Sequence, residues 1–204
     1  MSLRHAHDGA MAYSTTSARA ADSLRSISGE VLGVVDRLTH ESGEDLDRAA
    51  DRIHASARVF VLGAGRSGLA LRMTAMRLMH LGLAVHVVGD ATTPAITGQD
   101  VLLVASGSGT TSGIVRAAST AAGVGAGVVA ITTDRTSPLG ELADAIIVIP
   151  AATKQDHAGM LSAQYSGGLF EQSLVLVGDA LFDALWKMSG ATAEELWPRH
   201  ANLE

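Results

Sequence analysis

The sequence predicts an α/β fold, a doubly wound, five-stranded parallel sheet flanked by helices. Three observations support this prediction. Short apolar runs alternate with amphipathic stretches, which is the pattern of repeated strand–helix–strand units. Glycine-rich turns follow the first and the third run, as is common at the carboxyl edge of a parallel sheet. Aromatic residues make up only 3% of the 204 residues, so we expect an aliphatic core, which suits a sheet buried on both faces.

Five segments have the composition of buried strands. Each is short, rich in Val, Ile or Leu, and bounded by Gly, Asp, Ser or Pro. Right-handed crossovers between such strands give a doubly wound α/β domain. The predicted strands are residues 58–62, 84–88, 100–106, 127–132 and 144–150.

The other segments show helical periodicity. Two lie before the first strand, three between strands and two after the last strand. They are residues 20–39, 43–55, 67–81, 110–122, 137–143, 164–189 and 192–197. The sequence shows no linker and no internal repeat. We therefore expect a flexible tail over residues 1–18, and a single domain over residues 19–204 with N-terminal helices and a long C-terminal helix.

Composition excludes several classes of function. The formal net charge of −6 argues against a nucleic-acid backbone as the partner. The chain has no cysteine, which rules out disulfides, thiolate zinc sites and a cysteine nucleophile. Its histidines show no metal-ligand spacing, so we expect no metal. No apolar leader and no membrane-spanning run is evident, and a cytoplasmic protein is the expectation.

The first glycine-rich turn lies in residues 59–68, VFVLGAGRSG. Gly63, Gly65 and Gly68 have the spacing G-x-G-x-x-G, which is the fingerprint of a dinucleotide-binding turn. The same spacing suits any sharp strand-to-helix turn that presents N–H groups to a phosphate. Asp90 follows the second predicted strand, where a ribose-binding acid is expected. This motif alone leaves a nicotinamide dinucleotide and a smaller phosphate as alternatives.

The second turn, residues 106–113, has the sequence SGSGTTSG and directly precedes a predicted helix. Its glycines let the backbone approach a ligand, and the helix N-terminus adds N–H donors and a partial positive charge. A dinucleotide site has no need of hydroxyl groups here, whereas a terminal phosphate dianion does. The alternative is a Ser/Gly-rich loop with a helix-capping Thr. The predicted phosphate-binding residues are Ser106, Gly107, Ser108, Gly109, Thr110 and Thr111.

The two turns together resemble the sugar isomerase (SIS) domain, which has G-x-G-x-S after the first strand and S-x-S-G-x-T after a central strand. The segments GAGRSG, AMRLMHLG, HVVGDATTPAI, SGSGTTSGIV and GLFEQ occur in this order. From about residue 25 to its end, the chain is similar to the 6-phospho-3-hexuloisomerase family of the ribulose monophosphate pathway. One departure is Thr110, where many SIS loops carry an acidic residue.

This resemblance implies a flavodoxin-like strand order. It also implies an isomerase that interconverts D-arabino-3-hexulose 6-phosphate and D-fructose 6-phosphate through an enediol. A single carboxylate can carry the proton between neighbouring carbons, so no metal or redox cofactor is expected. The resemblance also implies a homotetramer that acts with 3-hexulose-6-phosphate synthase in formaldehyde fixation. Three alternatives stay open: another SIS isomerase acting on a pentose or heptose phosphate, a non-catalytic sugar-phosphate-binding protein, and a nicotinamide oxidoreductase.

Glu171 is the candidate general base. It lies among apolar neighbours in LFEQSLVLV, residues 169–177, where an unpaired buried charge would cost several kcal/mol. A solvated stripe of the helix is the alternative location, and the family resemblance points to the same glutamate as proton acceptor. The following residues, 174–186, are apolar on more than one side, whereas a surface helix of a monomer is one-sided. They therefore predict a helix buried against the sheet and against another subunit.

Four further features are candidates for the site. Ser67 follows the first strand, where SIS domains contact the sugar phosphate. Arg66 could pair with the phosphate or a sugar hydroxyl, or form a surface salt bridge instead. His80 could shuttle protons to substrate oxygens, although a core or interface histidine is the alternative. Residues 153–157, TKQDH, are a candidate lid.

Overall fold

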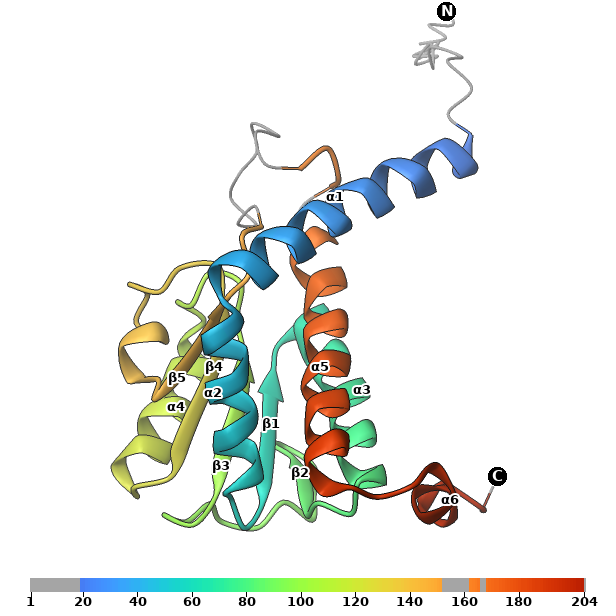
Figure 1. Ribbon diagram of the computed structural model, residues 1–204. Helices are drawn as coiled ribbons and strands as arrows, with labels where there is room; N and C mark the ends of the chain where they lie inside the picture. Colours follow the sequence, from blue (N-terminus) through green and yellow to red (C-terminus); the bar gives the residue numbers. More distant parts are fainter. Residues whose placement is uncertain (1–18, 152–161, 166–167, 204) are drawn as a thin grey trace, which may run out of the picture.

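Five parallel strands form one sheet in the order β2-β1-β3-β4-β5 in the computed structural model (Figure 1). The strands are β1 (Val59–Gly63), β2 (Val85–Val87), β3 (Val101–Ala105), β4 (Gly127–Thr132) and β5 (Ala145–Val148). Both the five strands and the flavodoxin-like order agree with the prediction. The structure describes residues 19–151, 162–165 and 168–203. The predicted tail at 1–18 and the candidate lid at 153–157 lie outside the described residues.

The helices also lie close to their predicted positions. Two precede the sheet, two connect its strands together with a short 3-10 turn, and the last segments follow it. They are α1 (Ala20–Glu41), α2 (Gly43–His54), α3 (Gly65–His80), α4 (Ser112–Gly123), η1 (Gly140–Leu142), α5 (Gly168–Ser189), α6 (Ala193–Leu196) and η2 (Trp197–Arg199). The predicted helix over 110–122 begins at Ser112 instead, because the two preceding threonines belong to the turn.

The prediction was also wrong about the start of the long C-terminal helix, which begins at Gly168 and not at residue 164. Residues 162–165 are held by the side chain of Glu30 on α1. That carboxylate accepts hydrogen bonds from Ser162 Oγ at 2.6 Å, from the Ala163 N–H at 3.0 Å and from Gln164 Nε2 at 3.0 Å. These polar groups are therefore fixed by α1 and do not extend α5.

The sheet separates two apolar cores. Helices α1, α2, α3 and α5 cover one face, and α4 with η1 covers the other. Neighbouring strand residues point to opposite faces, so Val59 and Val61 of β1 join the first core while Phe60 joins the second. The larger first core extends up to the start of α5, which brings this helix over the carboxyl edge of the sheet.

Helix α5 is covered by its own chain. It packs against α1, α2 and α3, and Leu174, Val177, Leu181 and Leu185 are all buried. At Gly178 the contact with α3 is so close that an added Cβ would overlap Thr74. Much of the apolar surface that predicted a subunit contact for α5 is thus buried within the chain.

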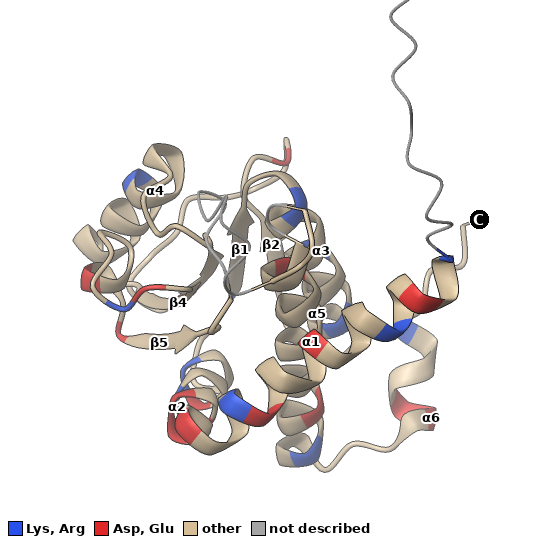
Figure 2. Cartoon of the chain, turned by 90° about the horizontal axis from the view of Figure 1, so that it is seen from above, with Lys and Arg blue, Asp and Glu red and all other residues tan. Residues whose placement is uncertain are grey.

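Charged residues lie outside the sheet. The five strands contain no Asp, Glu, Lys or Arg, and Figure 2 shows acidic and basic residues interspersed on the surrounding helices and connections. Among the described residues, no helix is long and apolar enough to cross a membrane.

Candidate active site

The turn between β1 and α3 packs strand against helix with almost no space between them. An added Cβ at Gly68 would lie 2.5 Å from the carbonyl oxygen of Gly63, and Gly65 has a φ of +57° that favours glycine. The G-x-G-x-x-G spacing is therefore explained by backbone packing. The turn starts α3 at the carboxyl edge of the sheet, so that Ser67 in its first turn faces a polar cavity.

That cavity lies between the two glycine-rich turns. It has a volume of about 60 Å³. Ala64 and Ser67 line it from the β1–α3 turn, and the β3–α4 turn contributes the rest, namely Ala105, Ser106, Gly107, Ser108 and Thr111. A small, polar concavity at two helix N-termini suits a phosphate group. We call it the phosphate cradle.

Hydroxyl groups of the β3–α4 turn contact each other at the cradle. Ser106 Oγ lies 3.2 Å from Thr111 Oγ1, and Ser108 Oγ accepts hydrogen bonds from the N–H and the Oγ1 of Thr110 at 3.3 and 3.0 Å. Thr111 is the N-cap residue of α4, yet its side chain forms no capping hydrogen bond. The first N–H groups of α4 consequently remain available to an anion.

Glu171 lies in the first turn of α5 and is 4% exposed, so it does not belong to a solvated stripe. Ser67 Oγ donates a hydrogen bond of 3.0 Å to Glu171 Oε1. Glu171 Oε2 is buried and has no hydrogen-bond partner in the described part of the chain. The structure thus joins the candidate base to the phosphate cradle through one serine, and leaves one carboxylate oxygen without a partner.

An apolar groove runs along the other side of Glu171, between α3 and α5. Leu69 and Met73 of α3 line it together with Val175 of α5, and Arg66 lies at its edge. The Arg66 side chain is exposed and forms no ion pair with a described residue, so the surface salt bridge considered for it is not observed. Arg66 and Glu171 therefore border one open space.

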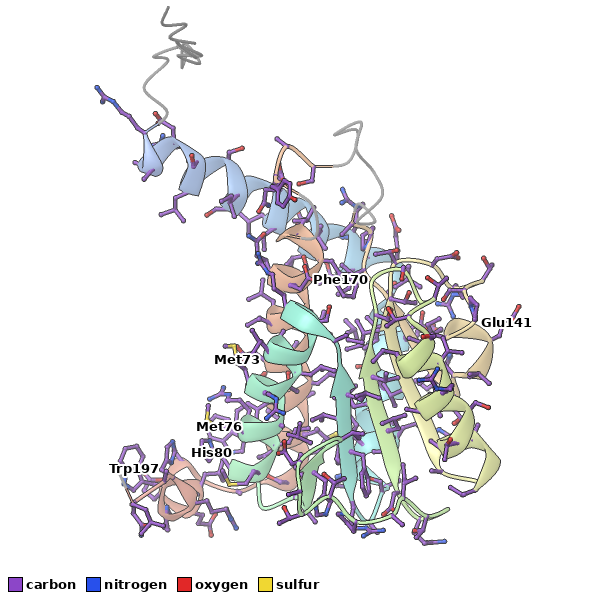
Figure 3. The ribbon with its side chains drawn as sticks, turned by 180° about the vertical axis from the view of Figure 1, so that it is seen from behind. Met73, Met76, His80, Glu141, Phe170 and Trp197 are labelled. Atoms are coloured by element: carbon purple, nitrogen blue, oxygen red, sulfur yellow. The ribbon has the colours of Figure 1, made fainter. Side chains whose placement is uncertain are left out.

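His80 lies far from this site within the chain. It is the last residue of α3, and the helical rise from Ser67 to His80 is about 20 Å. Figure 3 shows His80 and Phe170 at opposite ends of the helical layer. The His80 ring stacks on His200 with 4.1 Å between centroids, and burial, with His200 and Arg77 nearby, lowers its pKa. The structure does not bring His80 together with Glu171, and its contacts fit the alternative of a packing residue.

Asp90 does not form the ribose site expected of a dinucleotide-binding fold. Its carboxylate accepts a hydrogen bond of 3.0 Å from Arg72 of α3 on the protein surface. Asp90, the acid on which the nicotinamide alternative depended, is thus paired with α3. The hydroxyl-rich turn favours a phosphate ligand instead.

The comparisons with known proteins agree with this geometry. The SIS domain family matches residues 52–175, a range that includes both glycine-rich turns and Glu171. The chain belongs to the SIS domain family. A curated 3-hexulose-6-phosphate isomerase from Mycobacterium gastri is 57% identical over 171 residues, which are 84% of this chain and 86% of that protein. A protein of the same name from Bacillus subtilis is 40% identical over 80% of this chain and 89% of its own length.

A solved structure shows the same fold. The crystal structure of a hypothetical protein from Methanococcus jannaschii aligns with a TM-score of 0.77 at 29% identity, and the match covers 90% of this chain and 99% of that one. The report of that structure infers a function of 3-hexulose-6-phosphate isomerase for that protein. The SIS fold and the flavodoxin-like order are therefore established for this chain.

Two supports of this SIS site were not predicted from the sequence. Phe170 packs on the cradle, since a Cβ at Gly107 would lie 3.5 Å from its ring. Glu30 holds the segment before α5, and Gln164 and Gln172 exchange hydrogen bonds of 2.8 and 3.0 Å. Burial opposes ionisation of Glu30, but the hydrogen bonds it accepts outweigh burial and lower its pKa. Such contacts join distant segments and leave no local pattern.

Proposed function

We propose that this protein interconverts D-arabino-3-hexulose 6-phosphate and D-fructose 6-phosphate. The observation that carries the proposal is the contact between Ser67 and Glu171, which places a buried carboxylate beside the phosphate cradle. The names of the relatives from Mycobacterium gastri and Bacillus subtilis support the same reaction. Those names favour this activity over a pentose phosphate or heptose phosphate isomerase and over a non-catalytic binding protein.

The reaction moves a carbonyl group from C3 to C2. The base removes the proton from C2 of the hexulose phosphate, and the electrons of the broken C–H bond form the C2–C3 double bond of an enediolate. The hydroxyl proton passes from O2 to O3, and the base returns its proton to C3. This leaves a ketone at C2 and a hydroxyl at C3. One carboxylate serves as acid and base in turn, and Glu171 Oε2 accepts no hydrogen bond from the residues that the structure describes.

The cradle supplies binding energy at the far end of the substrate. The C6 phosphate would accept hydrogen bonds from Ser106, Ser108 and Thr111 and from the first N–H groups of α4, whose dipole favours an anion. Arg66, at the edge of the neighbouring groove, would contact sugar oxygens. These contacts lie away from the reacting carbons. By holding the phosphate, they would orient C2 and C3 of the substrate toward the base.

A coupled assay tests the proposal. Formaldehyde, ribulose 5-phosphate and a 3-hexulose-6-phosphate synthase generate the substrate, and fructose 6-phosphate is measured. We expect product only when this protein is present. Arabinose 5-phosphate and sedoheptulose 7-phosphate, offered separately, test the alternative isomerases. Conversion of either at a higher rate than the hexulose phosphate would replace the proposed substrate.

We also propose that the protein is a homo-oligomer, expected to be a tetramer, with its active sites near subunit boundaries. Support comes from α3, on which Leu69, Met73 and Met76 are 65%, 52% and 52% exposed. Figure 3 shows Met73 and Met76 pointing away from the chain. Contiguous apolar surface of this kind marks an interaction site, and it borders the groove beside Glu171.

Light scattering measures this assembly. The wild-type protein should exceed the 21.0 kDa of one chain, and Met73→Glu should reduce the measured mass. A monomeric wild-type protein at micromolar concentration would contradict the proposal. A pairing with 3-hexulose-6-phosphate synthase is a further proposal, and it rests on the substrate that the two enzymes would share.

A further inference from the structure

The carbonyl group of Gly107, in the middle of the cradle turn, accepts three hydrogen bonds from one neighbouring segment. It accepts from the Thr133 N–H at 3.1 Å, from Thr133 Oγ1 at 2.7 Å and from Thr132 Oγ1 at 3.2 Å. A carbonyl oxygen has two lone pairs, so the direction of the Gly107 C=O bond is set by how these three donors share its oxygen. All three come from the end of β4 and the residue after it, on the side away from β1.

The orientation of this carbonyl determines where the next N–H points. The described residues contain no cis peptide bond, and in a planar trans peptide the C=O and the following N–H point in opposite directions. With the Gly107 oxygen held toward β4, the Ser108 N–H points toward β1. That is the side on which Ala64 and Ser67 complete the cradle. The Ser108 N–H itself donates to no acceptor among the described residues.

The neighbouring residue of the turn is locked from the same side. Gly109 donates its N–H to the Ser106 carbonyl at 3.0 Å and accepts from the Leu139 N–H at 3.1 Å. Its φ is +62°, and an added Cβ would overlap Ser137. The segment after β4 thus holds the turn through Leu139 and Ser137.

We propose that Thr133, assisted by Thr132, is a positioning residue that aims the Ser108 N–H at the substrate phosphate by holding the Gly107 carbonyl on the opposite side. This inference concerns the site of the proposed function. It rests on that function only in taking a sugar phosphate as the ligand. Thr133 is half-buried and does not line the cradle. It acts through the peptide bond between Gly107 and Ser108 and does not touch the substrate.

The test compares three variants with the wild-type protein. Thr133→Val removes the side-chain donor and keeps the shape and the backbone N–H, and Thr133→Ser restores the hydroxyl. Thr136→Val is the matched control, because Thr136 lies in the same segment but its hydroxyl donates only to Asp134, at 2.7 Å. Inorganic phosphate is titrated into each full-length protein by calorimetry, and KM and kcat are measured for the hexulose phosphate.

We expect Thr133→Val to raise the Kd of inorganic phosphate and the KM by the same factor, about three- to tenfold, with kcat unchanged. Thr133→Ser should bind like the wild type, and Thr136→Val should show no change. Wild-type binding by Thr133→Val, failure of the serine to restore affinity, or an equal loss in Thr136→Val would each overturn the proposal. If Thr133→Val does not fold, Thr133→Ala replaces it under the same criteria.

A second readout reports on the peptide itself. In the wild type, phosphate should shift the amide resonance of Ser108, and the shift at saturation should shrink in Thr133→Val. An unchanged shift would overturn the proposal. Phosphate binding requires no turnover, so the proposed function and the positioning role of Thr133 can be contradicted independently. A wild-type protein that binds phosphate without isomerising the sugar contradicts the proposed function, whereas full isomerase activity with an unaffected Thr133→Val contradicts the positioning role.

Discussion

Gly109→Ala is the most informative single change in the cradle. Gly109 has a φ of +62°, and a Cβ at this position would overlap the buried side chain of Ser137. The left-handed conformation costs a non-glycine residue about 1–2 kcal/mol. Displacing a packed neighbour costs about 1–3 kcal/mol more. We therefore expect a loss of roughly 2–5 kcal/mol in the free energy of unfolding, unless the turn opens to relieve the overlap.

Either response is measurable. A loss of that size corresponds to a decrease of roughly 4–20 °C in Tm for a chain of this length. If the turn opens, its N–H groups move and phosphate affinity falls by about 10- to 100-fold for each hydrogen bond to the anion that is lost. Thermal unfolding and calorimetric titration with inorganic phosphate, on the same preparation, distinguish strain in the folded protein from displacement of the turn.

Two further variants show whether the overlap with Ser137 or the left-handed backbone causes the loss of stability. Gly109→Ala combined with Ser137→Gly removes the overlap but keeps the left-handed φ, so the double variant should be more stable than the sum of the single changes predicts. Gly123→Ala is the control, because Gly123 has nothing within 4 Å of its added Cβ and alanine favours a helix by about 0.5–1 kcal/mol. An unchanged Tm together with unchanged phosphate affinity in Gly109→Ala would refute the view that the turn is locked.

Three other outcomes follow from the structure. Ser108→Ala should weaken phosphate binding about ten- to a hundredfold, since it removes a hydrogen bond to a charged group; unchanged affinity in calorimetry would remove Ser108 from the cradle. The hydrogen bond from Arg58 holds the pKa of Asp100 at about 2, below its ordinary 3.8, so the stabilisation is fully present above about pH 4 and is lost as the pH falls toward 2. Asp100→Asn should therefore destabilise the protein at pH 7 by about 2 kcal/mol, and denaturant unfolding should show this difference shrinking below pH 4. Gly178→Ala should lower the Tm by separating α3 from α5, and Thr74→Ala should restore part of the loss; full stability of the single variant would mean that the helices shift without cost.

The fold was predictable because it depends on local periodicity. Each strand is a short aliphatic run, and the two glycine-rich turns mark the carboxyl edge of the sheet. The burial of Glu171 was predictable for a related reason, since an acid surrounded by apolar residues at helical spacing has few solvated positions available. Sequence patterns of this kind were sufficient for the sheet, for the places of the two turns and for the burial of Glu171.

The remaining features depend on contacts between distant segments. Glu30 holds the segment before α5 from a position 132 residues earlier than Ser162, and Thr133, which follows β4, contacts Gly107, which follows the neighbouring strand β3. Neither residue differs in type or spacing from an ordinary surface or turn residue. His80 shows a second limit of sequence reasoning. It was a candidate because it lies in a segment shared with the family, but the length of α3 places it at the opposite edge of the sheet from Ser67.

The isomerisation rate of Glu171→Gln tests the central claim most directly. The amide keeps the shape of the side chain and can still accept a hydrogen bond from Ser67, but it cannot take a proton from carbon. The account predicts that turnover falls by about 10²–10⁴ while the variant stays folded and binds fructose 6-phosphate with nearly wild-type affinity. Glu141→Gln, on the far side of the sheet (Figure 3), should retain full turnover. Retention of more than about a tenth of wild-type turnover by Glu171→Gln would contradict the account, because another group would then move the proton.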